Sequence, residues 1–240
     1  MAEWDLKRFW TETSVAYTEG EGWQVLLDKR VLRTPGKSML VLPTEQLAAA
    51  VSAEWAAQDE KVDPGTMPMT RTANSAIERV APQREAIVPM LAAYGETDLL
   101  SYRAEGPDAL VRRQADGWDP LLDWAADTLK APLGVTAGLI HASQPHSSLI
   151  TLRRQIEELS NFQLAAAHDL IAISGSLILA LATMHGRLAP DAAWKLSRVD
   201  EDWQSEQWGA DEEASQAAEQ KRLDFFDAHT FFTLAQSGGR

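Results

Sequence analysis

The spacing of apolar residues changes near residue 80, and this change constrains the fold more than any other feature of the chain. In the segment Gly22–Pro43, apolar residues alternate with polar ones in short runs that Asp28-Lys29 and Thr34-Pro35-Gly36 separate. This pattern predicts short strands joined by turns. Later apolar residues recur every three or four positions, which is the period of a helix. The sequence therefore predicts an α+β fold, with a small β-rich N-terminal domain at residues 1–80 and an all-α bundle at residues 81–240.

A helix is expected after Thr44, which can cap it. Leu47, Val51 and Trp55 follow at steps of four and form one apolar stripe. This stripe is expected to cover the small sheet. The segment Val62–Thr70, with two prolines and a glycine, predicts irregular structure near a domain boundary.

The other expected elements follow from apolar periodicity and from proline and glycine signals. They are a strand at Met39–Leu42 and helices at Gln83–Tyr94, Pro107–Trp118 with a break at Pro120, Leu149–Leu159, Leu170–Met184, Pro190–Gly209, and from Asp211 onward. The fifteen residues of Leu170–Met184 would extend only about 22 Å as a helix, against a hydrocarbon core of about 30 Å. They predict a buried central helix and no insertion into a membrane.

The charge balance excludes several classes of protein. The 240 residues include 22 Lys and Arg against 35 Asp and Glu, a formal charge of −13, which has the wrong sign for nucleic acids and anionic lipids. The absence of cysteine excludes disulfides, thiolate zinc sites and cysteine nucleophiles. Met1–Trp10 has neither secretory nor transit character. We expect a bacterial cytoplasmic protein, or a mitochondrial matrix protein if the chain is a processed eukaryotic form.

The usual catalytic and cofactor-binding motifs are missing from the sequence. Ser174-Gly175-Ser176 lies inside the expected buried helix, where small residues allow close packing. No two of the five histidines stand four residues apart, which is the spacing that places two ring nitrogens on one helical face. The histidines are His141, His146, His168, His185 and His229. We therefore expect no cofactor and no metal ion.

The segment Val199–Gln220 holds eight acidic residues and no Lys or Arg, and Trp203 and Trp208 are interleaved with the acids. Three interpretations are open. The segment could be a solvated acidic face whose tryptophans point into the core. It could be a surface that binds a basic segment of another protein. It could also supply the paired carboxylates and aromatic platform of a glycoside hydrolase.

Six motifs in one order, between Trp10 and Glu213, resemble the ATP-twelve (ATP12) family of assembly chaperones for the catalytic head of the F-type ATP synthase. They are Gly22-Trp23-x-Val25-x-Leu27-Asp28-x-Arg30-x-Leu32-x-Thr34-Pro35, Glu54-Trp55-x-x-Gln58, Met67-Pro68-x-Thr70, Thr97-Asp98-Leu99-x-x-Tyr102-Arg103, Gln114-x-x-x-Trp118-Asp119-Pro120-Leu121-Leu122 and Asp202-Trp203-Gln204-x-Glu206-x-Trp208-Gly209. The chain has Asp28-Lys29-Arg30 where the family usually has Asp-Gly-Arg.

This resemblance implies a non-enzymatic chaperone with an orthogonal helical bundle, which binds the unassembled α subunit and prevents its aggregation before it pairs with the β subunit. By motif it also implies functional roles for Trp55 and for Glu206, with Glu201 as the second choice. We expect a monomer. The predicted partner-binding residues are Glu206, Glu201, Trp203, Trp208, Asp202 and Trp55. For Trp55 the alternative is a place in the core, because it shares the apolar stripe of its helix.

Overall fold

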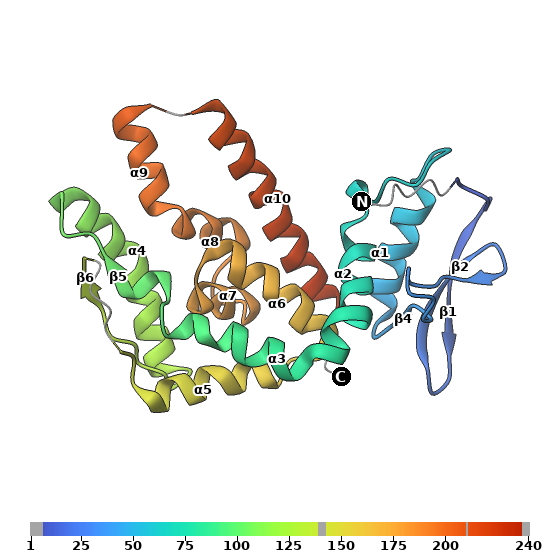
Figure 1. Ribbon diagram of the computed structural model, residues 1–240, viewed down its shortest axis with the longest axis horizontal. Helices are drawn as coiled ribbons and strands as arrows, with labels where there is room; N and C mark the ends of the chain where they lie inside the picture. Colours follow the sequence, from blue (N-terminus) through green and yellow to red (C-terminus); the bar gives the residue numbers. More distant parts are fainter. Residues whose placement is uncertain (1–6, 139–142, 210, 237–240) are drawn as a thin grey trace. The chain divides into compact units, whose positions relative to one another are not determined.

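The structure, a computed structural model, describes residues 7–138, 143–209 and 211–236 (Figure 1). It forms two compact units, a β-rich unit and a helical unit. The β-rich unit comprises Met1–Arg84, Ser160–Ala166 and Thr230–Arg240, and the helical unit comprises Glu85–Leu159 and Ala167–His229. The α+β class is thus confirmed. The division into domains at residues 1–80 and 81–240 stays a prediction, because compact units in one structure do not test which parts fold independently.

The β-rich unit contains a four-stranded antiparallel sheet. Its strands are β1 Thr13–Thr18, β2 Gly22–Leu27, β3 Arg30–Val31 and β4 Val41–Leu42. Strand β2 pairs with each of the other three. The strands predicted within Gly22–Pro43 are therefore present, whereas β1 was not predicted. Most of its side chains are exposed or half-buried, so its sequence carries little apolar alternation.

Both predicted turns of this sheet are present. Asp28 takes the left-handed backbone conformation at φ 54° that aspartate tolerates better than most residues. Its carboxylate accepts hydrogen bonds from the backbone N–H groups of Thr11 at 2.9 Å and Glu12 at 3.1 Å. These bonds lower the pKa of Asp28. At the second turn, Lys37 N–H donates to the Thr34 carbonyl at 2.9 Å.

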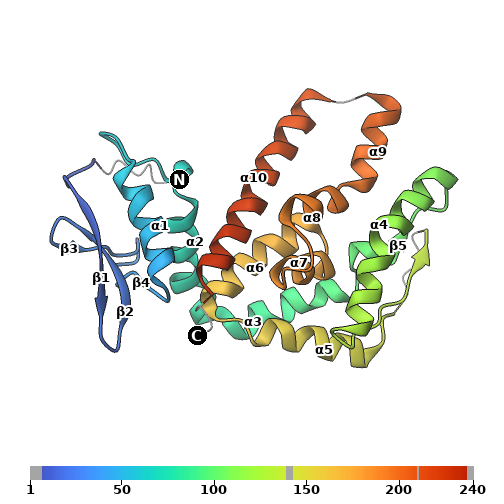
Figure 2. The ribbon, with the colours of Figure 1, turned by 180° about the vertical axis from the view of Figure 1, so that it is seen from behind.

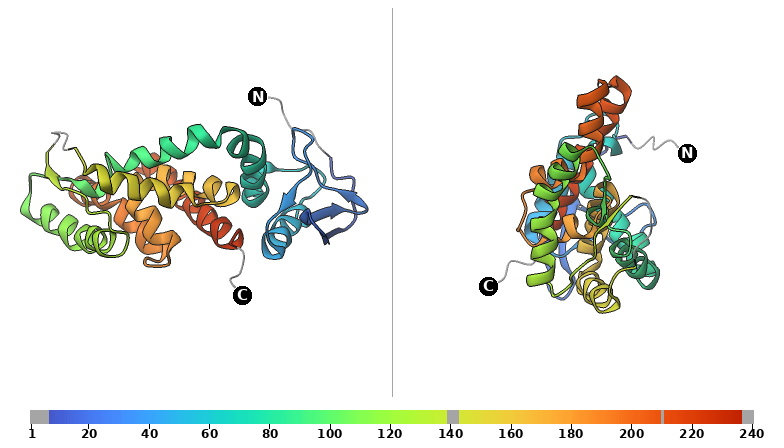
Figure 3. Two further views of the ribbon diagram at one scale, coloured as in Figure 1. Left: turned by 90° about the horizontal axis from the view of Figure 1, so that it is seen from below. Right: turned by 90° about the vertical axis from the view of Figure 1, so that its left-hand side faces the viewer.

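Helix α1, Glu45–Ala56, covers the sheet as predicted. Thr44 caps it by accepting a hydrogen bond from Leu47 N–H at 3.1 Å. Leu47, Val51 and Trp55 are buried, and the helix contacts β1 and β2 (Figure 3).

The prediction of irregular structure at Val62–Thr70 was wrong in part, because only Val62, Asp63 and Met67 are irregular. This segment contains the 3₁₀ turn η1, Pro64–Thr66, and the start of helix α2, Pro68–Ser75. A proline fits the first turn of a helix, where its missing N–H costs nothing. Glu54 of α1 supplies the cap, because its carboxylate accepts hydrogen bonds from the N–H groups of Met69 at 2.6 Å and Thr70 at 2.8 Å. The cap comes from a distant residue, so the local sequence does not reveal it.

The helical path continues from α2 through a π-helical turn, η2, Ala76–Val80, into α3, Ala81–Ala92. Gln83 has a non-helical backbone, φ −115° and ψ 16°, so the predicted start of a helix at Gln83 coincides with a kink within α3. The helical unit then contains η3 Ala93–Gly95, η4 Leu99–Ser101, β5 Tyr102–Arg103, α4 Asp108–Asp127, β6 Thr136–Ala137, α5 His146–Glu157, α6 Asn161–Ser174, α7 Leu177–Met184, α8 Pro190–Ser197, α9 Val199–Trp208 and α10 Glu212–Leu234. Helices α6 and α10 each contribute residues to both units. Within the helical unit, α7 contacts α8, and α4 contacts both α7 and α9 (Figure 2).

Helix α4 does not break at Pro120, contrary to the prediction. A proline inside a helix costs about 3 kcal/mol. Trp118 and Leu121 on either side of it are almost wholly buried, and the Trp118 indole N–H donates to the Leu196 carbonyl at 2.9 Å. Tertiary burial of both flanks outweighs the local cost.

The stretch Leu170–Met184 is largely buried, as predicted, but it forms two helices instead of one. Gly175, at φ 68°, separates α6 from α7, and Ser176 caps α7 by accepting from Leu179 N–H at 3.0 Å. The Ser174-Gly175-Ser176 sequence is therefore a junction between helices. The predicted helix at Pro190–Gly209 is likewise two helices, α8 and α9, which meet at Arg198. The last helix begins next to Asp211, as predicted.

Asp98 stabilises the junction between α6 and α7 through hydrogen bonds. Its fully buried carboxylate accepts hydrogen bonds from Ser176 Oγ at 2.7 Å, Ile178 N–H at 3.0 Å and Leu100 N–H at 3.0 Å. It thus caps η4 and the N-terminus of α7 together. Burial raises the pKa of Asp98, while these hydrogen bonds act in the opposite direction.

Candidate functional site

Helix α9 carries five of the six residues predicted to bind a partner. Asp200, Glu201 and Asp202 occupy its first turn, where the helix dipole favours negative charge. Gly209, at φ 93°, ends the helix. Val199 is the buried residue that anchors the helix, and most of the remaining side chains are exposed. We call Glu201, Asp202, Trp203, Glu206 and Trp208 the α9 surface.

Glu206 is bound within the protein. Arg113 of α4 donates two parallel hydrogen bonds to its carboxylate, each at 2.9 Å. The Arg113 guanidinium also lies over the Trp203 ring, 5.3 Å from its centre. Hydrogen bonding to Arg113 holds the pKa of the Glu206 carboxyl below its usual value. Glu206 and Trp203 therefore bind Arg113 and fix α9 against α4.

Residues of the Gln114-x-x-x-Trp118 motif support the same arrangement. Gln114 donates from Nε2 to the Asp200 carboxylate at 2.6 Å and accepts at Oε1 from Ala104 N–H at 2.8 Å. The hydrogen bond from Trp118 to the Leu196 carbonyl fixes α8 in the same way. This motif, one of the six on which the resemblance rests, thus supports helices α8 and α9.

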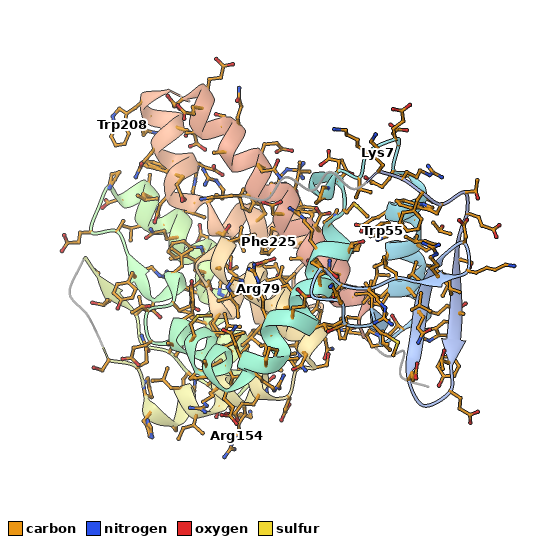
Figure 4. The ribbon with its side chains drawn as sticks, turned by 45° about the vertical axis from the view of Figure 1, so that its right-hand side comes forward. Lys7, Trp55, Arg79, Arg154, Trp208 and Phe225 are labelled. Atoms are coloured by element: carbon orange, nitrogen blue, oxygen red, sulfur yellow. The ribbon has the colours of Figure 1, made fainter. Side chains whose placement is uncertain are left out.

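Glu201 and Asp202 are the carboxylates of α9 that remain turned to solvent. Their contacts with Arg198 are long, at 3.6 Å and 3.7 Å, and both side chains are more than half exposed. Trp208 is 80% exposed, the highest value among the large hydrophobic residues that the structure describes as exposed (Figure 4). Helix α9 thus exposes a tryptophan and two weakly paired carboxylates, a combination that favours contact with another molecule.

Two other acidic residues of the Val199–Gln220 segment have local structural roles. Asp211 caps α10 by accepting from Ala214 N–H at 2.7 Å, and Glu219 forms an ion pair with Arg222 at 2.7 Å. The interpretation of the tryptophans as core residues is wrong for Trp208. It is wrong in part for Trp203, which is half-buried beneath Arg113.

Trp55 belongs to the β-rich unit and is 5% exposed. Its ring meets the Trp10 ring edge to face at 5.1 Å, and the Trp10 indole N–H donates to the Trp55 carbonyl at 3.3 Å. This burial favours the alternative interpretation of Trp55 as a core residue. Its part in partner binding stays a prediction.

The charges of the α9 surface differ from those of a glycoside hydrolase. Such an enzyme needs a carboxylic acid whose pKa is raised so that it can protonate the leaving group. Glu206 has its pKa lowered by Arg113.

Among the described residues, no group of three or more His, Asp or Glu side chains could hold a metal ion; His141 lies outside them. No helix in the described ranges is long and apolar enough to cross a membrane.

The fold is that of a chaperone. The family described as ATP12 chaperone protein matches this chain over residues 7–126. The chain therefore belongs to this family. ATP12-family proteins are chaperones for assembly of the ATP synthase, so the client is a subunit of that enzyme.

Individual relatives agree with this assignment. The chain is 26% identical to the Schizosaccharomyces pombe protein atp12, mitochondrial, in an alignment of 220 residues that covers 87% of this chain and 75% of that protein. It resembles the crystal structure of Atp12 from Paracoccus denitrificans with a TM-score of 0.94 and 52% identity, over 98% of this chain and all of that one. An aspartate-to-lysine mutant of the same bacterial protein matches with a TM-score of 0.94 and 51% identity over the same shares. The Agrobacterium tumefaciens protein Atu1473 matches with a TM-score of 0.91 and 40% identity, over 96% of this chain and 86% of that one.

Proposed function

We propose that this chaperone binds the unassembled α subunit of the ATP synthase catalytic head through the α9 surface. The bound α subunit is kept from aggregating until it pairs with the β subunit. The protein acts as a monomer and by binding alone, without catalysis. The observation that carries the proposal is the exposure of Trp208, Glu201 and Asp202 on one helix that α4 holds in place.

The physical character of this surface suits temporary protection of a client. A free subunit exposes an interface that is partly apolar and partly charged. Trp208 supplies apolar area that becomes buried on binding, and tryptophan is enriched among the residues that dominate binding energy. Glu201 and Asp202 supply charges that orient a basic client surface and speed its association. A surface of mixed character binds and still releases, because it buries no large hydrophobic groove.

The residues of the α9 surface divide into two roles. Glu201, Asp202 and Trp208 contact the client. Glu206 and Trp203 are positioning residues, since both bind Arg113 and so fix the direction in which the helix presents the other three.

The proposal is tested with isolated α and β subunits. In a light-scattering assay, the protein is expected to suppress aggregation of the α subunit at near-stoichiometric amounts and to leave the β subunit unprotected. Size-exclusion chromatography is expected to show a complex with one copy of each chain. Equal protection of both subunits, or protection of neither, would contradict the choice of client.

A charge swap separates positioning by Glu206 from direct contact. Glu206→Arg alone places two guanidinium groups together, so we expect faster hydrogen exchange of the α9 amides and weaker binding of the α subunit. Combining Glu206→Arg with Arg113→Glu restores the ion pair in reverse. The double variant is expected to recover both the slow exchange and the binding. Slow exchange without recovery of binding would mean that the Glu206 carboxylate itself contacts the client.

A further inference from the structure

The β-rich unit contains a cavity of about 480 Å³ that is separate from the α9 surface. Its walls include Leu32, Trp55, Val62 and Met67, which come from the sheet, α1 and the segment before α2. This volume lies in the range of sites that enclose a small molecule or a few side chains of a peptide.

A second cavity, of about 640 Å³, shares Leu32, Arg33 and Trp55 with the first. Phe9, which is 53% exposed, lies at this second cavity. Because these three residues line both cavities, the two cavities are neighbours. We call the two cavities together the Trp55 groove. Two neighbouring cavities with apolar walls suit two side chains of one peptide segment.

Two buried polar atoms in the residues that line the groove lack hydrogen-bond partners. They are the indole Nε1 of Trp55 and the side-chain Oδ1 of Asn74. Leaving a buried donor or acceptor unpaired costs about 1 to 3 kcal/mol, so native proteins rarely do it. The first atom is a donor and the second an acceptor. Both atoms are covered in the free protein, so a ligand reaches them only after neighbouring side chains move.

The rim of the groove is positively charged in a protein whose formal charge is −13. Arg33, Arg71 and Arg79 line the first cavity, and Arg30 lines the second. All four are exposed. The single acidic residue there, Glu78, has its carboxylate engaged by the backbone N–H of Gly36. Arginine presents its donors in a fork that matches carboxylates, so this rim selects an acidic ligand.

The rim includes a π-helical turn. Glu78 and Arg79 lie in η2, between α2 and α3, and Figure 4 labels Arg79 and Trp55. Such turns are rare and occur often at functional sites. The wider turn changes the direction of the side chains that follow α2, and Arg79 still lines the same cavity as Arg71.

We infer that the Trp55 groove binds an extended peptide segment of a partner protein in which apolar side chains are flanked by aspartate or glutamate. The apolar side chains occupy the two cavities. The flanking carboxylates bind the arginines of the rim. The inference concerns a second surface of opposite charge to the α9 surface, and it does not depend on which subunit α9 binds.

Fluorescence anisotropy with labelled synthetic peptides tests this inference on the full chain. The probe has a central leucine and phenylalanine flanked by glutamates, and two matched peptides carry serines or lysines in place of the glutamates. We expect the acidic peptide to bind at least tenfold more tightly than the serine peptide, and the lysine peptide to bind least. Equal affinity for the three peptides, or no binding of the acidic one, would overturn the proposal.

Variants locate the site of binding. Arg71→Glu and Arg79→Glu are each expected to weaken the acidic peptide about tenfold, because each loses a charge-assisted contact. Arg112→Glu makes the same change of charge at an exposed position of α4, outside the groove, and is expected to leave the affinity unchanged. The double variant Glu201→Lys and Asp202→Lys is expected to leave the affinity for the acidic peptide unchanged or slightly higher. A loss of peptide binding in either control variant, with an unaltered melting temperature, would place the binding outside the groove.

Trp55→Phe tests contact with the indole. Phenylalanine keeps an aromatic ring but is smaller than indole and lacks its N–H donor, so we expect weaker peptide binding in a chain that still unfolds cooperatively. The indole N–H resonance of Trp55 in wild type is expected to shift downfield on addition of the acidic peptide. A resonance that does not move while the peptide binds would show that Trp55 makes no contact with it.

Discussion

Replacing Asp98 with alanine is expected to lower the free energy of unfolding by about 3 kcal/mol, because the change leaves a buried hydroxyl and the N-terminus of α7 without their acceptor. The carboxylate is fully buried and accepts hydrogen bonds from Ser176, Ile178 and Leu100. The loss is smaller than the sum of these bonds, since burial of the charge itself costs free energy, as the raised pKa of Asp98 indicates. Urea denaturation measures the difference.

Asp116→Ala is the matched control for this substitution. Asp116 is an exposed aspartate of α4 in the same unit, and its replacement is expected to change the free energy of unfolding by less than about 0.5 kcal/mol. Equal stability of the Asp98→Ala variant and wild type would show that the junction between α6 and α7 does not need its cap.

Asp98 also predicts a pH dependence of stability. Its pKa in the folded chain is raised above the ordinary value of 3.8, so between these two values the folded state binds more protons than the unfolded state. Stability from this group therefore falls as the pH rises through that interval. Asp98→Asn is expected to remove this contribution from the pH profile, and an unchanged profile would contradict the assignment.

The fold class and several elements could be predicted because their signals are local. The alternation in Gly22–Pro43, the turn residues, and the stripe of Leu47, Val51 and Trp55 act over a few positions. The features that were mispredicted depend on distant partners. Glu54 caps α2 from another helix, and the burial of Trp118 keeps α4 intact through Pro120.

The prediction of one continuous helix at Leu170–Met184, without the break at Gly175, was an error of another kind. A glycine followed by a serine that can cap the next helix is a local signal for a junction. The high apolar content of Leu170–Met184 concealed it, because a uniformly buried segment has no polar face whose period would change at the junction.

The candidate site was located from the sequence but not resolved into roles. The run of acids and tryptophans was plain, whereas their partners lie far along the chain. Arg113 and Glu206 are 93 residues apart, and Gln114 and Asp200 are 86 residues apart. Only the folded chain shows that Glu206 and Asp200 are bound internally while Glu201, Asp202 and Trp208 face solvent.

Changing those three exposed residues together is expected to abolish most client binding. The combined variant Glu201→Lys, Asp202→Lys and Trp208→Ser is expected to lower the affinity for the isolated α subunit at least a hundredfold. It removes the main apolar contact and reverses two orienting charges, and a few such residues commonly carry most of the binding energy. All three side chains are more than half exposed, but Glu201 and Asp202 lie in the first turn of α9, where lysines oppose the helix dipole, so a small decrease in the melting temperature is expected.

The most direct test of this account is a titration of the isolated α subunit with wild type, with this α9 variant and with a control variant. The control carries Asp123→Lys, Asp127→Lys and Ile150→Ser, which make the same change of charge and remove one exposed apolar side chain on α4 and α5. We predict equal affinities for wild type and the control variant, and a loss of at least a hundredfold for the folded α9 variant. Wild-type affinity in the α9 variant would contradict the assignment of α9 as the client-binding surface.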